Sequence, residues 1–157
     1  MANEHDERIK DFGLFLETFS RLEQIIIRSL EQRAGLPGPW FEVLLSISRS
    51  EAGRLKMNEL AERLFLTTGG ITRLIDRMGE AGLVIRQACP SDRRVQWIAL
   101  TDQGRAKFDE ALPIHLADLS KYFTGALTPA EFESFMKALE KLRVAARNAT
   151  NRRQESG

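Results

Sequence analysis

The order of elements between residues 57 and 100 restricts the fold of this 157-residue chain more than any other feature. Apolar residues recur three and four positions apart and predict one short helix over 57–64 and a second over 68–81. Thr67 is a suitable N-cap for the second helix, and Gly82 is a suitable residue to end it. The connection between the two predicted helices is therefore very short.

Two β-rich stretches follow the second helix. They read LVIRQA over 83–88 and VQWIAL over 95–100, with Pro90-Ser91-Asp92 as a turn signal between them. Helix, helix, strand, loop and strand is the order of a winged helix-turn-helix. In that fold the second helix enters the major groove of DNA.

The segments on either side of this core are predicted to be helical. Apolar periodicity and capping signals favour helices over 9–33, 40–48 and 101–124, with a final helix that begins after Thr128. We therefore expect a mainly α fold with a small β-wing and one domain over residues 1–157. The helix-turn-helix lobe would occupy 54–100, between N-terminal helices in 8–50 and C-terminal helices in 101–149.

The overall composition excludes several other classes of protein. Hydrophobic residues make up 43% of the chain and charged residues 29%, which fits a packed globular domain. No apolar run approaches the roughly 20 residues of a membrane helix, and the polar N-terminus does not resemble a secretory signal. A single cysteine, Cys89, cannot form an internal disulfide, so we expect a reducing, cytoplasmic location.

The net charge of +1 hides a segregation of charge along the chain. Residues 1–53 carry 6 basic and 9 acidic side chains, whereas residues 54–105 carry 9 basic and 6 acidic ones. Eight of those nine basic residues are arginines, whose planar donor groups suit phosphates and guanine edges. An ordinary solvated surface is the alternative interpretation of this charge.

The predicted helix over 68–81 has one apolar and one polar face. The polar face would present Thr68, Gly69, Thr72, Arg73 and Arg77 to DNA. Glycine at 69 and at the next position lets the backbone approach a phosphate, and the N-terminal amides add partial positive charge.

The predicted wing carries Asp92, Arg93 and Arg94 at its tip or returning edge. An arginine there can enter a narrow, electronegative minor groove. The carboxylate of Asp92 would orient a neighbouring arginine, Arg94 or Arg77. A simple turn residue is the alternative.

The stretch MNELAERLFLTTGGITRLIDRMGEAGLVIRQACPSDRRVQWIALTDQGR resembles the DNA-binding core of the multiple-antibiotic-resistance regulator (MarR) family. The resemblance implies a homodimer whose N- and C-terminal dimerisation helices interlock across a two-fold axis. It also implies a transcriptional regulator, more often a repressor, that binds double-stranded DNA at a pseudo-palindromic operator. No enzymatic activity and no cofactor are implied.

The resemblance assigns roles to individual residues. Thr68, Thr72, Arg73 and Arg77 would contact the major groove or phosphates, and Arg94, beside Asp92, would be the wing contact. Arg54 and Arg63 are weaker candidates for phosphate contacts. Arg86 lies on a predicted strand and is expected only to pair with a neighbour.

Family members often bind small aromatic or phenolic effectors between the dimer helices and the DNA lobe. Six residues of this chain would surround such a pocket: Phe15, Phe19, Trp40, Phe41, Met57 and His115. The stronger alternative is that these side chains belong to the core, because an aromatic stripe at helical spacing usually does.

Two other functions remain open from the sequence. One is a winged-helix module that binds protein rather than DNA, and the other is a redox-responsive regulator that uses Cys89. Redox-sensing relatives place their cysteine near the N-terminal helix, so the resemblance does not support the second. Nucleotide-binding glycine loops, nucleophile elbows and zinc-ligand spacings do not occur in the sequence.

Overall fold

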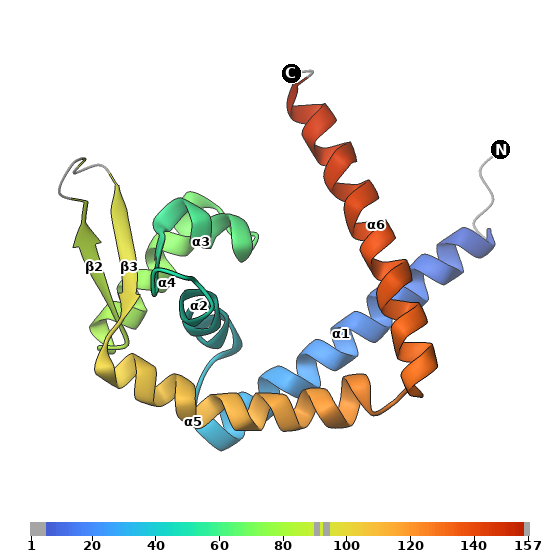
Figure 1. Cartoon of the computed structure of the whole chain (residues 1–157), viewed down its shortest axis with the longest axis horizontal. Helices are drawn as coiled ribbons and strands as arrows, with labels where there is room; N and C mark the ends of the chain where they lie inside the picture. Colours follow the sequence, from blue (N-terminus) through green and yellow to red (C-terminus); the bar gives the residue numbers. More distant parts are fainter. Residues whose placement is uncertain (1–5, 90–91, 93–94, 156–157) are drawn as a thin grey trace. The chain divides into compact units, whose positions relative to one another are not determined.

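The computed structural model describes residues 6–89, 92 and 95–155 (Figure 1). In chain order the elements are α1 (Glu7–Ala34), α2 (Gly38–Ser48), β1 (Arg54–Lys56), α3 (Met57–Arg63), α4 (Thr68–Glu80), β2 (Val84–Ala88), β3 (Gln96–Leu100), α5 (Asp102–Asp118), η1 (Leu119–Thr124) and α6 (Pro129–Glu155). They form two compact units, Met1–Asp118 and Leu119–Gly157. The predicted mainly α fold with a small wing is confirmed.

The wing is part of a three-stranded antiparallel sheet with the order β1-β3-β2. The sequence predicted β2 and β3 but not β1, because its three residues are too short a polar–apolar–polar run to indicate a strand. Pairing with β3 creates this strand: Leu55 lies opposite Ile98, and both side chains are buried. Neighbours distant in sequence thus determine a strand that local preference does not reveal.

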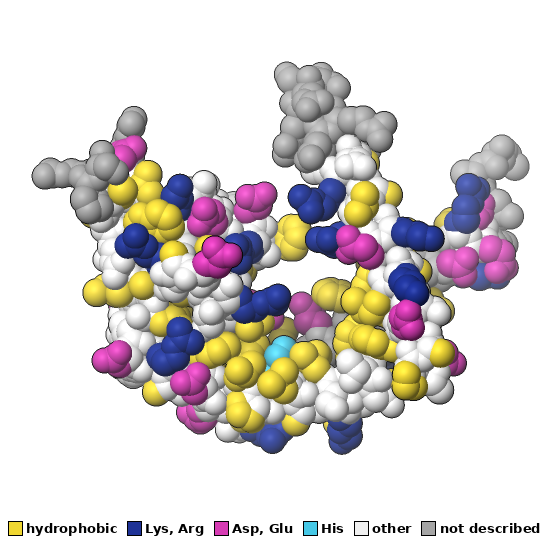
Figure 2. Space-filling model, viewed as in Figure 1, with side chains coloured by type: hydrophobic (Ala, Val, Ile, Leu, Met, Phe, Trp, Pro, Cys, Tyr) yellow, Lys and Arg dark blue, Asp and Glu magenta, His cyan; other side chains and the backbone are white. Residues whose placement is uncertain are grey.

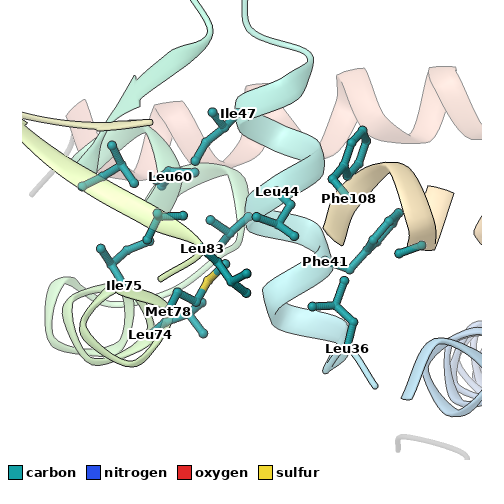
Figure 3. Packing of buried hydrophobic residues seen from close by; sticks show 14 of the residues in the cluster. Leu36, Phe41, Leu44, Ile47, Leu60, Leu74, Ile75, Met78, Leu83 and Phe108 are labelled. Atoms are coloured by element: carbon teal, nitrogen blue, oxygen red, sulfur yellow. The ribbon is translucent and has the colours of Figure 1, made fainter. Parts of the chain in front are cut away.

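Helix α2 lies at the centre of the first unit. Its Phe41, Leu44 and Ile47 are fully buried. Figure 3 shows these residues between Leu60, Ile75 and other apolar side chains of the helix-turn-helix on one side and Phe108 of α5 on the other. The aromatic ring of Phe41 stacks on that of Phe108, with centroids 5.8 Å apart. One continuous core therefore joins the helix-turn-helix to α5.

The first turn of α5 is attached directly to the end of α4. The Thr101 hydroxyl donates to the Gly82 carbonyl (2.6 Å) and accepts from the Gly104 amide (2.9 Å), so the predicted N-cap is confirmed. The Thr101 amide also donates to the Leu83 carbonyl (3.1 Å). Gly104 is buried against that same carbonyl, and an added Cβ would lie 1.9 Å from its oxygen. Only glycine fits at this contact.

The helix predicted over 101–124 is not one regular helix. Its α-helical part ends at Asp118, and Leu119–Thr124 form a π-helix that begins the second unit. In this unit the ring of Phe123 packs edge-on against those of Phe132 and Phe135. The predicted capping box of α6 is confirmed, because the Glu131 carboxylate accepts from the Thr128 amide (2.8 Å) and the Thr128 hydroxyl accepts from the Glu131 amide (3.4 Å).

Large apolar side chains remain exposed on both terminal helices. On α1 they are Ile9, Phe12, Leu14, Phe15, Leu16, Phe19 and Ile25, and on α6 they are Phe135, Met136, Leu142 and Val144. Figure 2 shows apolar side chains along the surface of α6. Within the described part of the chain, no helix is both long and apolar enough to traverse a lipid bilayer.

Candidate nucleic-acid interface

Helix α4 is held by one face and presents the other to solvent. Its apolar stripe, Ile71, Leu74, Ile75 and Met78, is buried as predicted. The Thr67 hydroxyl accepts from the Gly70 amide (3.1 Å), which caps the N-terminus. Thr68, Gly69, Arg73 and Arg77 are exposed, whereas Thr72 is half-buried and its hydroxyl donates to the Thr68 carbonyl (2.7 Å). The polar face therefore projects from a firmly anchored helix.

The two arginines of this face line a concavity in the surface together with Asp76. Asp76 forms an ion pair with Arg86 on β2, which confirms the expectation that Arg86 pairs with a neighbour. No described residue forms an ion pair with Arg73 or Arg77. Because Asp76 is already paired, both guanidiniums are available for an anionic ligand such as a phosphate.

The two glycines at the start of α4 have different surroundings. A Cβ added at Gly69 would meet nothing within 4 Å, so this position leaves the helix N-terminus open to an approaching group. A Cβ at Gly70 would lie 3.2 Å from the Thr67 hydroxyl. Gly70 thus leaves room for the cap, while Gly69 leaves room for a partner.

A second cationic group lies on the outer face of the sheet, and sequence reasoning found only one of its members. The Arg54 guanidinium lies 4.7 Å from the ring centroid of Trp97, and the Lys56 ammonium lies 5.2 Å from it. Residues 54 and 56 share one face of β1, and Lys56 is in register with Trp97 of β3. A cross-strand partner cannot be read from one strand, so Lys56 and Trp97 were missed. Arg63, at the end of α3, is exposed.

The wing is a paired hairpin whose tip is only partly described. Strands β2 and β3 pair from Val84 with Leu100 to Ala88 with Gln96. At the tip the Asp92 carbonyl accepts from the Val95 amide (3.0 Å). Arg93 and Arg94 lie outside the described residues, so their contacts and the orienting role of Asp92 stay predictions. Cys89 follows β2 directly and is half-buried.

Sequence comparison identifies relatives that share both the lobe and the flanking helices. A sequence model of the MarR family matches residues 34–95. The HTH-type transcriptional repressor MdtR of Bacillus subtilis is 30% identical over 97% of this chain and 96% of its own length. The chain belongs to the MarR family. This confirms the resemblance seen in the helix-turn-helix and wing segments.

Solved structures of MarR-family regulators share the same fold. AbsC from Streptomyces coelicolor superposes with a TM-score of 0.85 at 28% identity, covering 94% of this chain and 99% of AbsC. Sco3205 from the same organism, whose structure was solved in complex with DNA, gives a TM-score of 0.83 at 28% identity. The superposition covers 94% of this chain and 91% of the Sco3205 chain. The winged helix-turn-helix architecture of this MarR-family chain is thus shown.

The six candidate effector residues of this MarR-family chain are in different environments. Phe41 is fully buried in the core, and the ring of His115 packs against it with centroids 4.6 Å apart. Trp40 and Met57 are half-buried and pack against the same core. Phe15 and Phe19 are exposed on α1. The structure therefore brings Phe41 and His115 into contact, and a shared pocket for all six residues stays a prediction.

His115 is half-buried and lies near a buried carboxylate on the same helix, α5. Its Nδ1 is buried and has no hydrogen-bond partner among the described residues, and the same holds for Oδ2 of Asp118, one turn further along α5. The other carboxylate oxygen of Asp118 lies 3.7 Å from the Arg33 guanidinium. Burial lowers the pKa of His115, and the nearby Asp118 carboxylate opposes that effect. His115 is therefore neutral in the folded protein at neutral pH.

This burial predicts a dependence of stability on pH. An unfolded chain binds a proton at histidine below a pH of about 6.5, whereas folded His115 does so only at lower pH. The unfolded state then holds more protons, so the free energy of unfolding falls as the medium becomes acidic. We expect wild type to lose more stability than His115→Phe between pH 7 and pH 5, measured as urea midpoints. An equal loss of stability in both proteins would contradict the lowered pKa of His115 in the folded state.

Proposed function

We propose that this chain is a DNA-binding transcriptional regulator in which α4 occupies the major groove and the wing reaches the adjacent minor groove. The observation that carries the proposal is the exposed polar face of α4, where Arg73 and Arg77 line one concavity and form no ion pair with a described residue. Helix-turn-helix proteins present this face, and these residue types, to base edges and phosphates. The DNA complex of Sco3205 supports the same use of the fold.

The regulator is proposed to act as a homodimer. The exposed apolar residues of α1 and α6 form more apolar surface than single scattered residues on a monomer would, and a second copy would cover it. Two symmetric recognition helices require a pseudo-palindromic operator with half-sites about one helical turn apart. Repression is the proposed outcome, in line with the repressor name of MdtR.

A small aromatic or phenolic effector is proposed to release this regulator from DNA. The support in this chain is the contact between the rings of Phe41 and His115 and the unpartnered Nδ1 of His115. Both groups are buried, so binding would require α2 and α5 to separate and admit an aromatic molecule, with its ring against Phe41 and its hydrogen-bond donor toward Nδ1 of His115.

Binding to random duplex DNA across a series of salt concentrations tests the proposal. Wild type should bind at low salt, and log affinity should fall linearly with log salt concentration. Arg73→Ala should weaken binding about fivefold and reduce the steepness of this line by about one unit if Arg73 contacts a phosphate. Arg8→Ala removes an exposed arginine outside the helix-turn-helix lobe and is the matched control. It should change neither the affinity for DNA nor the salt dependence of that affinity.

Two outcomes would decide against DNA binding. Absence of binding by the wild type at low salt would favour a protein-interaction module. Equal affinity and equal salt dependence in wild type and Arg73→Ala would remove Arg73 from the interface. Selection of bound sequences from a random duplex pool would then give the operator, its symmetry and its half-site spacing.

A further inference from the structure

The turn between α3 and α4 is built around a phenylalanine in the left-handed region. Phe65 has a φ of 53°, and it is the one non-glycine residue with positive φ in the described part of the chain. Its amide donates to the Glu62 carbonyl (3.2 Å), and the Leu66 amide donates to the Ala61 carbonyl (2.9 Å). This pair of bonds is a Schellman motif, which normally has glycine at the left-handed position.

The same chain uses glycine where the same turn occurs elsewhere. At the end of α4 the amide of Gly82 (φ 74°) donates to Gly79, and the next amide donates to Met78, in the same pattern. Gly35, with a φ of 60°, likewise follows the end of α1. A bulky side chain in this conformation is destabilising relative to glycine. Phe65 is therefore not the residue that the turn itself requires.

Packing does not explain Phe65 either. Its side chain is 96% exposed, the highest value among the exposed large apolar residues described. The following residue, Leu66, makes the local contact instead, since its side chain lies near the first turn of α4 at Gly70. A large aromatic ring in water contributes nothing to the core, so the ring has no packing role within the described part of the chain.

The position of the ring indicates what it can contact. Phe65 lies two residues before Thr67, the N-cap of α4, and three before Thr68, the first residue of the exposed polar face. Phe65 thus lies just before the N-terminus of α4, the helix that is proposed to enter the major groove. Apolar side chains in that place pack against thymine methyl groups and deoxyribose carbons.

We propose that Phe65 is an apolar DNA contact at the entry of the recognition helix, with its ring against a thymine methyl or the adjacent sugar. This inference rests on the proposed function. The contact would add affinity without neutralising a phosphate, and it would favour a thymine at one position of each half-site.

Replacing Phe65 with glycine separates the two effects of this residue. Phe65→Gly should raise the Tm of the free protein by about 2–4 °C, because it relieves the left-handed phenylalanine. It should also weaken binding to the selected operator about tenfold, because the apolar contact is lost. The salt dependence of binding should not change. Phe65→Tyr keeps the ring and should bind within about twofold of the wild type.

The results distinguish this inference from the proposed function. If wild type binds the operator and Phe65→Gly binds equally well, the Phe65 contact is wrong while the function stands. A shift of Phe65→Gly from dimer to monomer in sedimentation would also overturn the contact, because the ring would then face a second copy. If wild type does not bind DNA, the proposed function fails first.

Discussion

Gly104→Ala is expected to destabilise the protein more than any other single change considered, by about 3 kcal/mol or more. The new Cβ would lie 1.9 Å from the Leu83 carbonyl oxygen and 2.9 Å from its carbon, so backbone rather than a flexible side chain must move. That movement would break the Thr101 amide bond to the same carbonyl. For a chain of this size, the Tm should fall by about 6–12 °C.

A second glycine provides the matched control. Gly69→Ala also places a methyl group in a helix, but nothing lies within 4 Å of it. Its Tm should stay level or rise slightly, because alanine favours the helix over glycine by up to about 1 kcal/mol. Thermal unfolding of the two variants, followed by circular dichroism, gives the comparison. A Gly104→Ala protein as stable as the wild type would mean that α5 does not contact Leu83 this closely.

The double variant Phe12→Glu, Phe19→Glu is expected to abolish the dimer and with it high-affinity operator binding. Phe12, Leu16 and Phe19 lie three and four residues apart, so they form one exposed apolar face of α1. Burying two carboxylates in an apolar interface without partners costs several kcal/mol. Operator affinity should fall at least about a hundredfold, because a monomer can engage only one half-site.

Sedimentation at micromolar concentration, together with operator binding, measures this effect. Lys10→Glu changes charge on the same helix without touching the apolar face, and it should leave both measurements unchanged. A double variant that remains dimeric would move the interface away from α1. A wild type that is monomeric at micromolar concentration would remove the homodimer from the proposal.

The recognition lobe was predictable because local signals determine it. The stripe of Ile71, Leu74 and Ile75, the Thr67 cap and Gly82 act within one helix and its ends, so a single sequence reveals them. They place Arg73 and Arg77 on the exposed face without any knowledge of the rest of the chain. The two longer strands were recognisable from their β-branched and aromatic residues for the same reason.

Features that depend on distant residues were not predictable. Strand β1 forms because Leu55 pairs across to Ile98, and the group around Trp97 exists only in that register. The end of α5 at Asp118, followed by a π-helix, has no motif of its own in the sequence. The left-handed conformation of Phe65 could not be predicted either, because Leu-Phe-Leu lacks the glycine that normally marks such a turn.

The bonds of Thr101 have a mechanical consequence. Thr101 connects the first turn of α5 to Gly82 and Leu83, and Asp76 connects α4 to Arg86 on the wing strand. The N-terminus of α5 is therefore bonded to the segment between α4 and β2, and α4 is itself ion-paired to β2. A movement of α5 is therefore expected to displace together the two elements that are proposed to contact DNA. Regulation would then alter the distance between the two recognition helices of the proposed dimer and leave the contacts of each helix within its half-site unchanged.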